Sequence, residues 1–513
     1  MSINIPELCK DAYINIALDT IRLGKQALIF TNSKPGAEKS AEEISKKNKN
    51  NELSELSEQI LKTLPKPTKQ CERLAKCVKH GIAFHHSGLH PKQKEIIENA
   101  FRDGTIKIIA CTPTLAAGLD MPAFRTILRE VKRYTNTGYN WIQTLEYYQM
   151  AGRAGRPGKE DYGESILIAN DKKHSEELLN RFIYGSPEDI FSKLAVEPVL
   201  RTYILSLISS GFVNSKKEII DFFSKTFWAF QFRDLDKLIF IIEKMLRLLI
   251  DFKFIETSNT NNFSSIDEIN TKLYMATALG KRVAELYIDP LTANHILNCL
   301  SRNDNPSPLG LLQMTSHTLE MMPLLKVKMK EFDSYQNEII RYTEELLEPE
   351  PTIYDYEYDE FLNSLKTALF FNDWIEENYE DYLLEKYNIT PGAVHTKLTI
   401  LDWLLYTSAE IANIANLKSS IKHINKVRFR IKHGIKEELI PLCRLNNISK
   451  IRARKLYNNG IKDLGDIKKA NFQTLIQILG EKIALNIKSQ VGQKIEPEVK
   501  PTKRIGQMGL TKY

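Results

Sequence analysis

Four short apolar runs, separated by amphipathic segments, constrain the fold of the first third of this chain most strongly. The runs are QALIF at 26–30, GIAFHH at 81–86, IKIIAC at 106–111 and ESILIA at 164–169. Such runs, ending in small or polar residues, are typical of buried parallel strands. The segment PKQKEIIENAFR at 91–102 has helical periodicity and predicts a helix that covers the sheet. The pattern indicates an α/β layer fold, whose ligands bind at the carboxyl ends of the strands.

The pattern changes after this region, and 513 residues exceed what one hydrophobic core supports. Between 190 and 290, helices precede two strand-like segments, FKFIETS and KLYMATALG, which flank a polar stretch. Residues 291–410 read as helical, and a short basic helical segment follows. We therefore predict a multidomain protein, α/β first and then mainly α.

The composition excludes a membrane-spanning or disulfide-stabilised protein. The chain is 42% hydrophobic and 26% charged, and it contains no run of 18 apolar residues. Its first residues, MSINIPELCK, lack the pattern of a secretory signal. The six cysteines have no framework spacing. We expect a cytoplasmic protein with no membrane partner.

Charge is distributed unevenly along the chain. The net charge is +7, but residues 411–513 hold 22 Lys and Arg against 7 Asp and Glu. Residues 331–390 hold 17 acidic side chains against 3 basic ones. A basic C-terminal segment beside an acidic one favours a polyanion bound at chosen surfaces. The alternative is a lysine-rich face that is only solvated.

The stretch QMAGRAGRPG at 149–158 places Arg153 and Arg156 in a glycine-rich turn. Guanidinium groups present forked donors that suit phosphate oxygens, and glycine lets the backbone approach a ligand closely. An arginine aimed at a transferring phosphoryl group stabilises charge in the transition state. This string predicts phosphate chemistry, although surface arginines can also be merely solvated.

A second polar turn, TPTLAAGLDMPA at 112–123, follows the third apolar run. Thr112 and Thr114 offer hydroxyl groups before a helix begins, and Gly118 allows close approach of a ligand. Asp120 can accept hydrogen bonds from a ribose. An ordinary strand-to-helix turn is the alternative, but the arginine-rich turn downstream argues against it.

These stretches, with LIFTNSK at 28–34 and AFHHSGL at 83–89, resemble motifs IV to VI of superfamily 2 helicases. The residues in these stretches are most similar to those of archaeal Hjm/HelQ-type DNA helicases. The resemblance continues through EPVLRTYILSLISSGF and PGAVHTKLTILDWLLYTSAEIA to the C-terminal helices. It implies five regions: a second RecA-like motor domain (1–188), a winged helix (189–290), a helical ratchet bundle (291–412), a helix-hairpin-helix domain (413–493) and a disordered tail (494–513).

The resemblance implies that ATP is clamped between two RecA-like domains. Arg156 would contact the γ-phosphate with help from Arg153, Gln149 would lie near the nucleotide, and Gly118 and Asp120 would lie near the ribose. No Gly-x-x-x-x-Gly-Lys-Ser/Thr loop or acidic box occurs in the sequence. We therefore expect a first RecA-like domain, with the Mg²⁺ ligands, to be supplied by another chain, and this sequence to be a fragment or a split-gene product.

The resemblance also implies contacts with single-stranded or forked DNA from several regions. In the motor domain they involve Ser33, His86, Thr112 and Thr114. Residues 129–148 predict a β-hairpin whose aromatic residues Tyr134, Tyr139 and Trp141 lie near the tip and separate strands, the alternative being that they pack on the domain. Further contacts come from Lys397, Trp403, Arg452 and Arg454.

Two of these DNA contacts depart from the family pattern. The family has an arginine seven residues before the stacking tryptophan, where this chain has Thr396 beside Lys397. The hairpin before Arg452 has Asn446 and Asn447 in place of glycines. Asparagine tolerates left-handed backbone, though less readily than glycine. We expect Trp403 to stack on a base and the two arginines to contact phosphates.

Two short patterns remain. Gln507, Leu510 and Tyr513 resemble a truncated binding box for the sliding clamp (PCNA), which predicts weak clamp binding or, alternatively, an unstructured basic terminus. Histidines and cysteines gather at 71–90, but their spacing fits no zinc motif, so we predict no metal ligands in this chain.

The sequence thus predicts the larger part of an ATP-dependent 3′-to-5′ DNA helicase that acts on forks or recombination intermediates. A non-catalytic nucleic-acid-binding subunit derived from a helicase is the alternative, and an RNA helicase is a weaker third possibility.

Overall fold

The structure is a computed structural model that describes residues 4–48, 53–64, 66–118, 120–135, 138–156, 158, 160–194, 196–232, 234–259 and 272–493. The chain divides into two compact units. The first unit is Met1–Ser192 with Asn388–Lys397, and the second is Lys193–Tyr387 with Leu398–Tyr513. Each unit is described by itself below.

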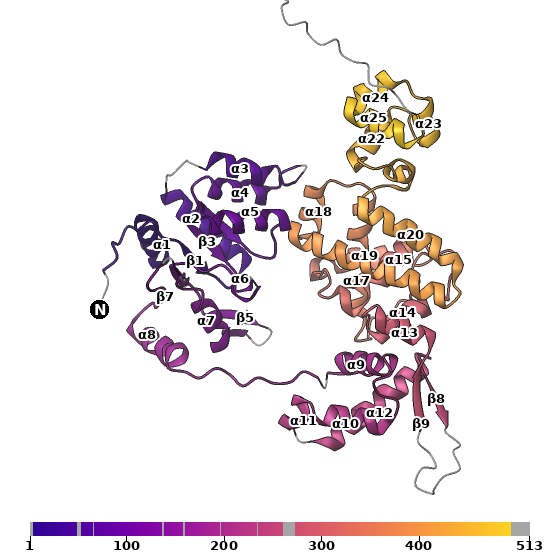
Figure 1. Ribbon diagram of the computed structural model, residues 1–513, viewed down its shortest axis with the longest axis horizontal. Helices are drawn as coiled ribbons and strands as arrows, with labels where there is room; N and C mark the ends of the chain where they lie inside the picture. The colour runs from indigo at the N-terminus through magenta and orange to yellow at the C-terminus, as the bar shows by residue number, and fades with distance from the viewer. Residues whose placement is uncertain are drawn as a thin grey trace, which may run out of the picture. The chain divides into compact units, whose positions relative to one another are not determined.

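A five-stranded parallel sheet forms the centre of the first unit, with the strand order β2-β3-β1-β4-β7 (Figure 1). The strands are β1 Ala27–Phe30, β2 Ile82–His85, β3 Ile108–Cys111, β4 Arg125–Leu128 and β7 Glu164–Leu167. Four of them coincide with the four apolar runs, so the predicted parallel α/β fold is confirmed. The core contains the apolar side chains of β1, β2 and β3.

Strand β4 was not predicted, because it begins with a charged residue. The Arg125 side chain is only 3% exposed, yet it contacts Asp19 at 2.6 Å and also pairs with Glu164. A buried charge is tolerated when it is paired and hydrogen-bonded. Partners from α1 and β7 therefore allow this strand to lie inside the sheet.

Helices connect the strands of the first unit. They are α1 Ala12–Arg22, α2 Lys34–Lys47, α3 Ser54–Leu61, α4 Lys69–Val78, α5 Pro91–Arg102, α6 Thr114–Gly118, α7 Thr144–Ala151 and α8 Lys172–Leu178, followed by a π-helical turn at Leu179–Ile183. Helix α5 coincides with the helix predicted at 91–102. Between β4 and α7, β5 Lys132–Thr135 and β6 Gly138–Trp141 pair as an antiparallel hairpin, as the sequence predicted.

The second unit opens with helices and a two-stranded wing. The elements are α9 Glu197–Ser209, α10 Lys216–Ser224, α11 Phe227–Phe232, α12 Leu235–Asp251, β8 Ile255–Asn259, β9 Lys272–Ala276 and α13 Ala278–Glu285. Strands β8 and β9 are antiparallel, and they begin within FKFIETS and KLYMATALG. The predicted wing is therefore present.

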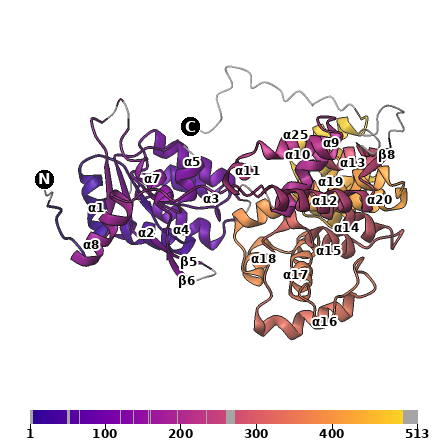
Figure 2. The same ribbon diagram turned by 90° about the horizontal axis from the view of Figure 1, so that it is seen from below.

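The remainder of the second unit is helical. Its helices are α14 Pro290–Leu300, α15 Pro308–Ser316, α16 Phe332–Tyr342, α17 Tyr358–Ile375, α18 Glu380–Tyr387, α19 Pro391–Ile414 (whose first turns belong to the first unit), α20 Lys418–His433, α21 Ile440–Cys443, α22 Lys450–Asn458, α23 Leu464–Lys469, α24 Phe472–Leu479 and α25 Glu481–Gln490, with 3₁₀ turns at Leu319–Met321, Met329–Glu331 and Glu437–Leu439. Helix α16 packs on α17 around a small core that includes Ile339 and Phe361 (Figure 2). In the part of the chain that the structure describes, no helix combines the length and apolar character needed to cross a membrane.

Candidate nucleotide and nucleic-acid surfaces

Three polar side chains gather at the carboxyl edge of the parallel sheet. Ser33 follows β1 and caps α2 by accepting a hydrogen bond from the Gly36 N–H at 3.1 Å. Thr112 follows the neighbouring strand β3, and its Oγ1 lies 2.9 Å from that of Thr114. All three residues keep accessible surface. Their placement is compatible with the DNA contacts that the resemblance implies.

His86 lies at the end of β2, but its side chain is not available to DNA. The residue is 0% exposed, and its Nε2 lies 3.1 Å from Oε1 of Glu38. Its Nδ1 accepts a hydrogen bond from the Gly88 N–H at 3.1 Å. Because both ring nitrogens are engaged inside the domain, the expected His86–DNA contact is corrected to a structural role that holds the loop after β2.

Arg153 joins the arginine-rich turn to the segment that follows α6. Its guanidinium donates hydrogen bonds to the Ala116 carbonyl, at 3.1 Å from Nε and 2.5 Å from Nη2. Its Nη1 lies 3.4 Å from Asp120, whose side chain is 96% exposed. Gly118, two residues before Asp120, has open space where a Cβ would project. Arg153, Gly118 and Asp120 therefore share one accessible place.

Helix α7 carries the glutamine of the same motif. The Glu188 carboxylate accepts hydrogen bonds from the Thr144 N–H at 2.8 Å and so fixes the first turn of α7. Gln149, in the second turn, is exposed. Because α6 and α7 pack together, Gln149 and Arg153 come from elements in contact with the Gly118 segment.

Arg156 is bound more tightly within the domain than Arg153. It pairs with Glu160 through Nε at 3.1 and 3.2 Å and through Nη2, and its Nη1 donates to the side chain of Gln26. The side chains of Arg156 and Glu160 are 16% and 2% exposed. The hydrogen bond from Arg156 holds the pKa of Glu160 below its usual value, although burial opposes this. Glu160 was missed from sequence, although its spacing of four residues from Arg156 is a usable signal.

The hairpin presents two tyrosines to solvent. Tyr134 and Tyr139 are opposite each other across β5 and β6, and they are 84% and 66% exposed. The turn residues 136–137 lie outside the described residues.

Trp141 lies at the base of the hairpin and not near the tip. It is paired in register with Lys132, whose Nζ is 3.8 Å from the indole ring centre, and its ring packs 5.9 Å from that of Phe182. The expected position of Trp141 among the tip aromatics is therefore wrong, because the apolar ring is anchored against the domain core.

The two candidates on α19 differ in accessibility. Lys397 is only 8% exposed, and burial lowers its pKa to about 8. Its side chain is therefore not displayed as the expected surface cation, because the ammonium group lies among other protein atoms. Trp403 is partly exposed on the same helix, so part of its ring remains accessible.

The two C-terminal arginines also differ. Arg452 keeps accessible surface and donates to the Asn447 carbonyl at 2.8 Å. Asn447 has φ 67°, the left-handed backbone that asparagine tolerates. Arg454 forms ion pairs with Glu377 at 2.6 Å and Glu438 at 2.8 Å. Two carboxylates neutralise Arg454, so its expected phosphate contact is corrected to a structural ion pair.

The cysteines and histidines at 71–90 have protein partners. Cys71 accepts from Gln93 at 3.1 Å, Ser45 contacts Cys77 at 3.8 Å, and His85 pairs with Glu98 at 2.9 Å. No metal-ligand group occurs among them in the described ranges. Gln507, Leu510 and Tyr513, with the rest of the tail at 494–513, lie outside the described residues.

Comparison with known proteins places these surfaces in a family. Residues 10–158 match the helicase conserved C-terminal domain, 163–256 a helix-turn-helix domain, and 309–434 the archaeal helicase domain 4. The ATP-dependent DNA helicase Hel308 of Methanococcus vannielii is 36% identical over 527 residues, which cover 96% of this chain and 69% of that protein. The Hel308 proteins of Pyrococcus horikoshii and Pyrococcus abyssi are each 37% identical, and in each case the match covers 96% of this chain and 68% of the relative.

The chain belongs to the Hel308 family of DNA helicases. The helicase resemblance and the order of α/β, helix-turn-helix and helical regions are thereby confirmed. The individual domain boundaries and site roles remain predictions.

Proposed function

We propose that this chain forms the second motor domain and the DNA-binding part of an ATP-dependent 3′-to-5′ DNA helicase that acts on forked or recombination-intermediate DNA. The observation that supports this most is the link between Arg153 and the Asp120 segment. It brings a cation, a glycine and a ribose-type acceptor to one accessible surface in a Hel308-family chain. Such a surface suits one side of a bound nucleotide.

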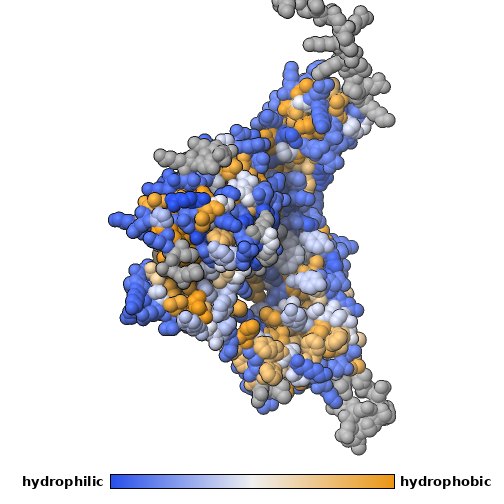
Figure 3. All heavy atoms as spheres, turned by 60° about the vertical axis from the view of Figure 1, so that its left-hand side comes forward, coloured by the Kyte–Doolittle hydropathy of each residue, from blue (hydrophilic) through white to orange (hydrophobic). Residues whose placement is uncertain are grey.

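The phosphate-wrapping loop and the magnesium ligands have to come from another domain, because the sequence contains neither motif. We propose that a first RecA-like domain or subunit supplies them in the cytoplasm, with ATP and Mg²⁺ bound there. Exposed aromatic side chains support a protein partner for the second unit. Phe230 on α11 and Phe240 on α12 are each 69% exposed. Figure 3 shows that hydrophobic patches lie among hydrophilic surface on the face in view.

Of the two arginines, Arg153 is the more available to phosphate. Its ion pair with Asp120 is 3.4 Å long and exposed, and exposed pairs of this kind contribute about 0–1 kcal/mol. Its two hydrogen bonds to Ala116 go to a neutral carbonyl and not to a carboxylate. Arg156 would have to leave the buried Glu160 and Gln26. We therefore propose that Arg153 contacts the phosphates first, which reverses the order expected from the sequence.

The DNA path would include Ser33, Thr112 and Thr114 in the motor domain, with Tyr134 and Tyr139 as the strand-separating pair. In the second unit we propose stacking on Trp403 and a phosphate contact by Arg452. Weak sliding-clamp binding by the tail at 494–513 stays a separate proposal.

The test is hydrolysis of ATP by the chain with and without a first RecA-like domain from a Hel308 relative. We expect DNA binding but no hydrolysis from the chain alone, and DNA-stimulated hydrolysis from the mixture. Arg153→Ala should reduce the rate in the mixture by about 10³-fold without weakening DNA binding. The matched control is Arg102→Ala, which removes a half-exposed arginine from α5.

Two results would contradict the proposal. Hydrolysis by the 513 residues alone would show that the missing motifs are not required. A mixture that binds both domains and DNA yet never hydrolyses ATP would instead favour the non-catalytic binding subunit.

A further inference from the structure

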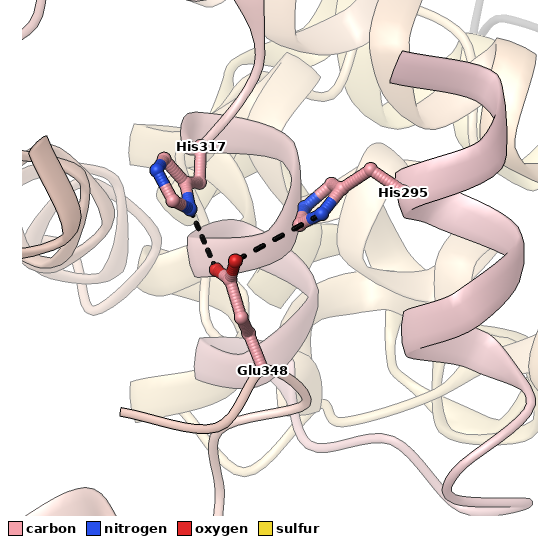
Figure 4. A group of neighbouring side chains, drawn as sticks. All are labelled: His295, His317 and Glu348. Carbon is pink, nitrogen blue, oxygen red and sulfur yellow. Dashed lines mark hydrogen bonds and ion pairs between the residues drawn. The ribbon is translucent and has the colours of Figure 1, made fainter. Parts of the chain in front are cut away.

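Two histidines and a glutamate from three separate segments of the second unit converge on one point. His295 lies on α14, His317 directly follows α15, and Glu348 lies beyond α16. One donor atom from each lies within 4.8 Å of the others. Figure 4 shows both imidazole rings directed at the Glu348 carboxylate from opposite sides.

The hydrogen bond made by His295 fixes which of its nitrogens faces the carboxylate. Its Nε2 lies 3.1 Å from the Met314 carbonyl, which can only accept, so Nε2 carries the proton. In the neutral ring, Nδ1 of His295 presents a lone pair toward Oε1 of Glu348 at 3.9 Å. The lone pairs of His295 Nδ1 and Glu348 Oε1 face each other, so a cation between the two atoms would bind to both.

A backbone carbonyl that holds the distal N–H of a histidine is also the usual support of a metal-binding imidazole. Glu348 has comparable support, because Gln313 is 0% exposed and donates its Nε2 to Oε2 of Glu348 at 2.9 Å. The carboxylate is therefore oriented from behind by one side chain and faced by two rings.

On the other side of the carboxylate, Nδ1 of His317 lies 2.7 Å from Oε2 of Glu348. The proton shared here occupies the position that a metal ion would take, and metal binding would release it to solvent.

Cys299 supplies a fourth candidate donor. It is one turn beyond His295 on α14, and its Sγ is 3.9 Å from Nδ1 of His295. Donors around tetrahedral zinc, with bonds of about 2.0–2.3 Å, lie roughly 3.3–3.6 Å apart. The separations of 2.7 Å and 3.9 Å between the histidine nitrogens and Glu348 lie on either side of that value, so small side-chain movements would bring these three ligands to it. Cys299 lies outside the group of three and would need a larger movement to join it.

A cavity borders Glu348, one of the three residues of the cluster. This cavity of about 280 Å³ is lined by Glu348, Arg302, Ile339 and Thr343 among others. Arg302 adds an opposing positive charge, but its Nη1 is engaged by the Leu347 carbonyl at 3.4 Å.

We propose that His295, His317 and Glu348, completed by Cys299, form a structural zinc site in the helical part of the second unit. Two imidazoles with a thiol favour zinc over magnesium or calcium, which prefer oxygen ligands. The ion would join α14, the end of α15 and the segment after α16. Because these elements are distant in sequence, zinc would stabilise the folded helical unit independently of ATP chemistry.

The experiment uses the full chain without a histidine tag, stripped with chelator and then exposed to Zn²⁺. Zinc content is measured by mass spectrometry after removal of free metal, and unfolding is followed by calorimetry in a separate sample that contains free zinc. We expect about one zinc per chain and a rise in the thermal midpoint of roughly 5 °C or more when free zinc is about 100 times its Kd. Magnesium at the same concentration should give no shift.

His295→Asn is the main variant, because asparagine offers no imidazole nitrogen to a metal ion. It should lose both the bound zinc and the midpoint shift. His174→Asn, which removes a histidine of the first unit, is the matched control and should keep both. If His295→Asn does not fold, Cys299→Ser is read with Co²⁺ in place of zinc, where loss of the sulfur-to-cobalt absorption is expected.

Three outcomes would overturn the proposal. One is a folded wild-type chain that retains no zinc. Another is zinc retention by His295→Asn equal to that of the wild type, which would indicate adventitious binding elsewhere. The third is a cobalt spectrum that Cys299→Ser leaves unchanged, which would exclude the thiol.

Discussion

Replacing the two tip tyrosines with Tyr134→Ala and Tyr139→Ala removes the surface that we propose to separate DNA strands. The two rings face each other across the hairpin and are 84% and 66% exposed. Because they contribute little to the domain core, the substitution should remove a DNA contact and leave the fold intact.

The magnitudes of the two effects are well separated. An aromatic ring stacked on a base contributes about 1–3 kcal/mol, so two rings contribute about 2–6 kcal/mol. Even about 2 kcal/mol changes the equilibrium between paired and separated bases by more than tenfold. The lost cross-strand pair costs only about 0.2–1 kcal/mol of folding stability.

The assay is fluorescence of 2-aminopurine placed at the junction of a forked DNA, which rises when the base unstacks. The wild-type chain should raise the signal on binding, and the double variant should bind DNA while raising it at least tenfold less. The matched control is Tyr354→Ala with Tyr356→Ala, since both tyrosines are almost fully exposed in the second unit.

An unchanged junction signal from the double tyrosine variant would refute the proposal that these tyrosines separate the strands.

Trp141→Ala tests the corrected position of the tryptophan, because its ring packs on Phe182. We expect that variant to lose folding stability, by less than the roughly 3–5 kcal/mol of a fully buried tryptophan, because Trp141 is only partly buried. A stable Trp141→Ala chain would show that the ring is not an anchor.

The remaining predictions concern charged side chains. Glu160→Gln should cost about 1–3 kcal/mol at neutral pH in urea unfolding, because Arg156 loses its charged acceptor. The hydrogen bond from Arg156 lowers the pKa of Glu160 from 4.5, so its stabilisation is present above that pH and is lost as the pH falls through the folded value. In the Glu160→Gln variant, the free energy of unfolding should therefore fall less steeply as the pH is lowered. An unchanged pH dependence at low pH would contradict this. In the C-terminal segment, Arg452→Ala should weaken DNA binding and reduce its salt slope by about 1. Arg454→Ala should instead destabilise the fold through Glu377 and Glu438, and the proposal fails if the two variants behave alike.

Local patterns were sufficient for the elements of the fold. The four apolar runs became parallel strands and 91–102 became α5, because burial and periodicity are properties of neighbouring residues. Strand β4 was not predicted because it begins with the charged residue Arg125. Only the ion pairs with Asp19 and Glu164 allow this charge to be buried in the sheet. The left-handed Asn447 was also predictable, since that preference belongs to the residue type itself.

The sequence by itself determined the α/β and helical order, the hairpin and the family motifs, because these depend on residues close together in the chain. Only the tertiary structure decided which motif residues are free to act. His86 is engaged by Glu38 at a separation of 48 residues, and Arg454 by Glu377 at a separation of 77. His317 and Glu348 meet across 31 residues without any common motif. Burial and ion pairing are set by whichever distant side chains the fold brings within a few ångströms, and spacing along the chain carries no record of that.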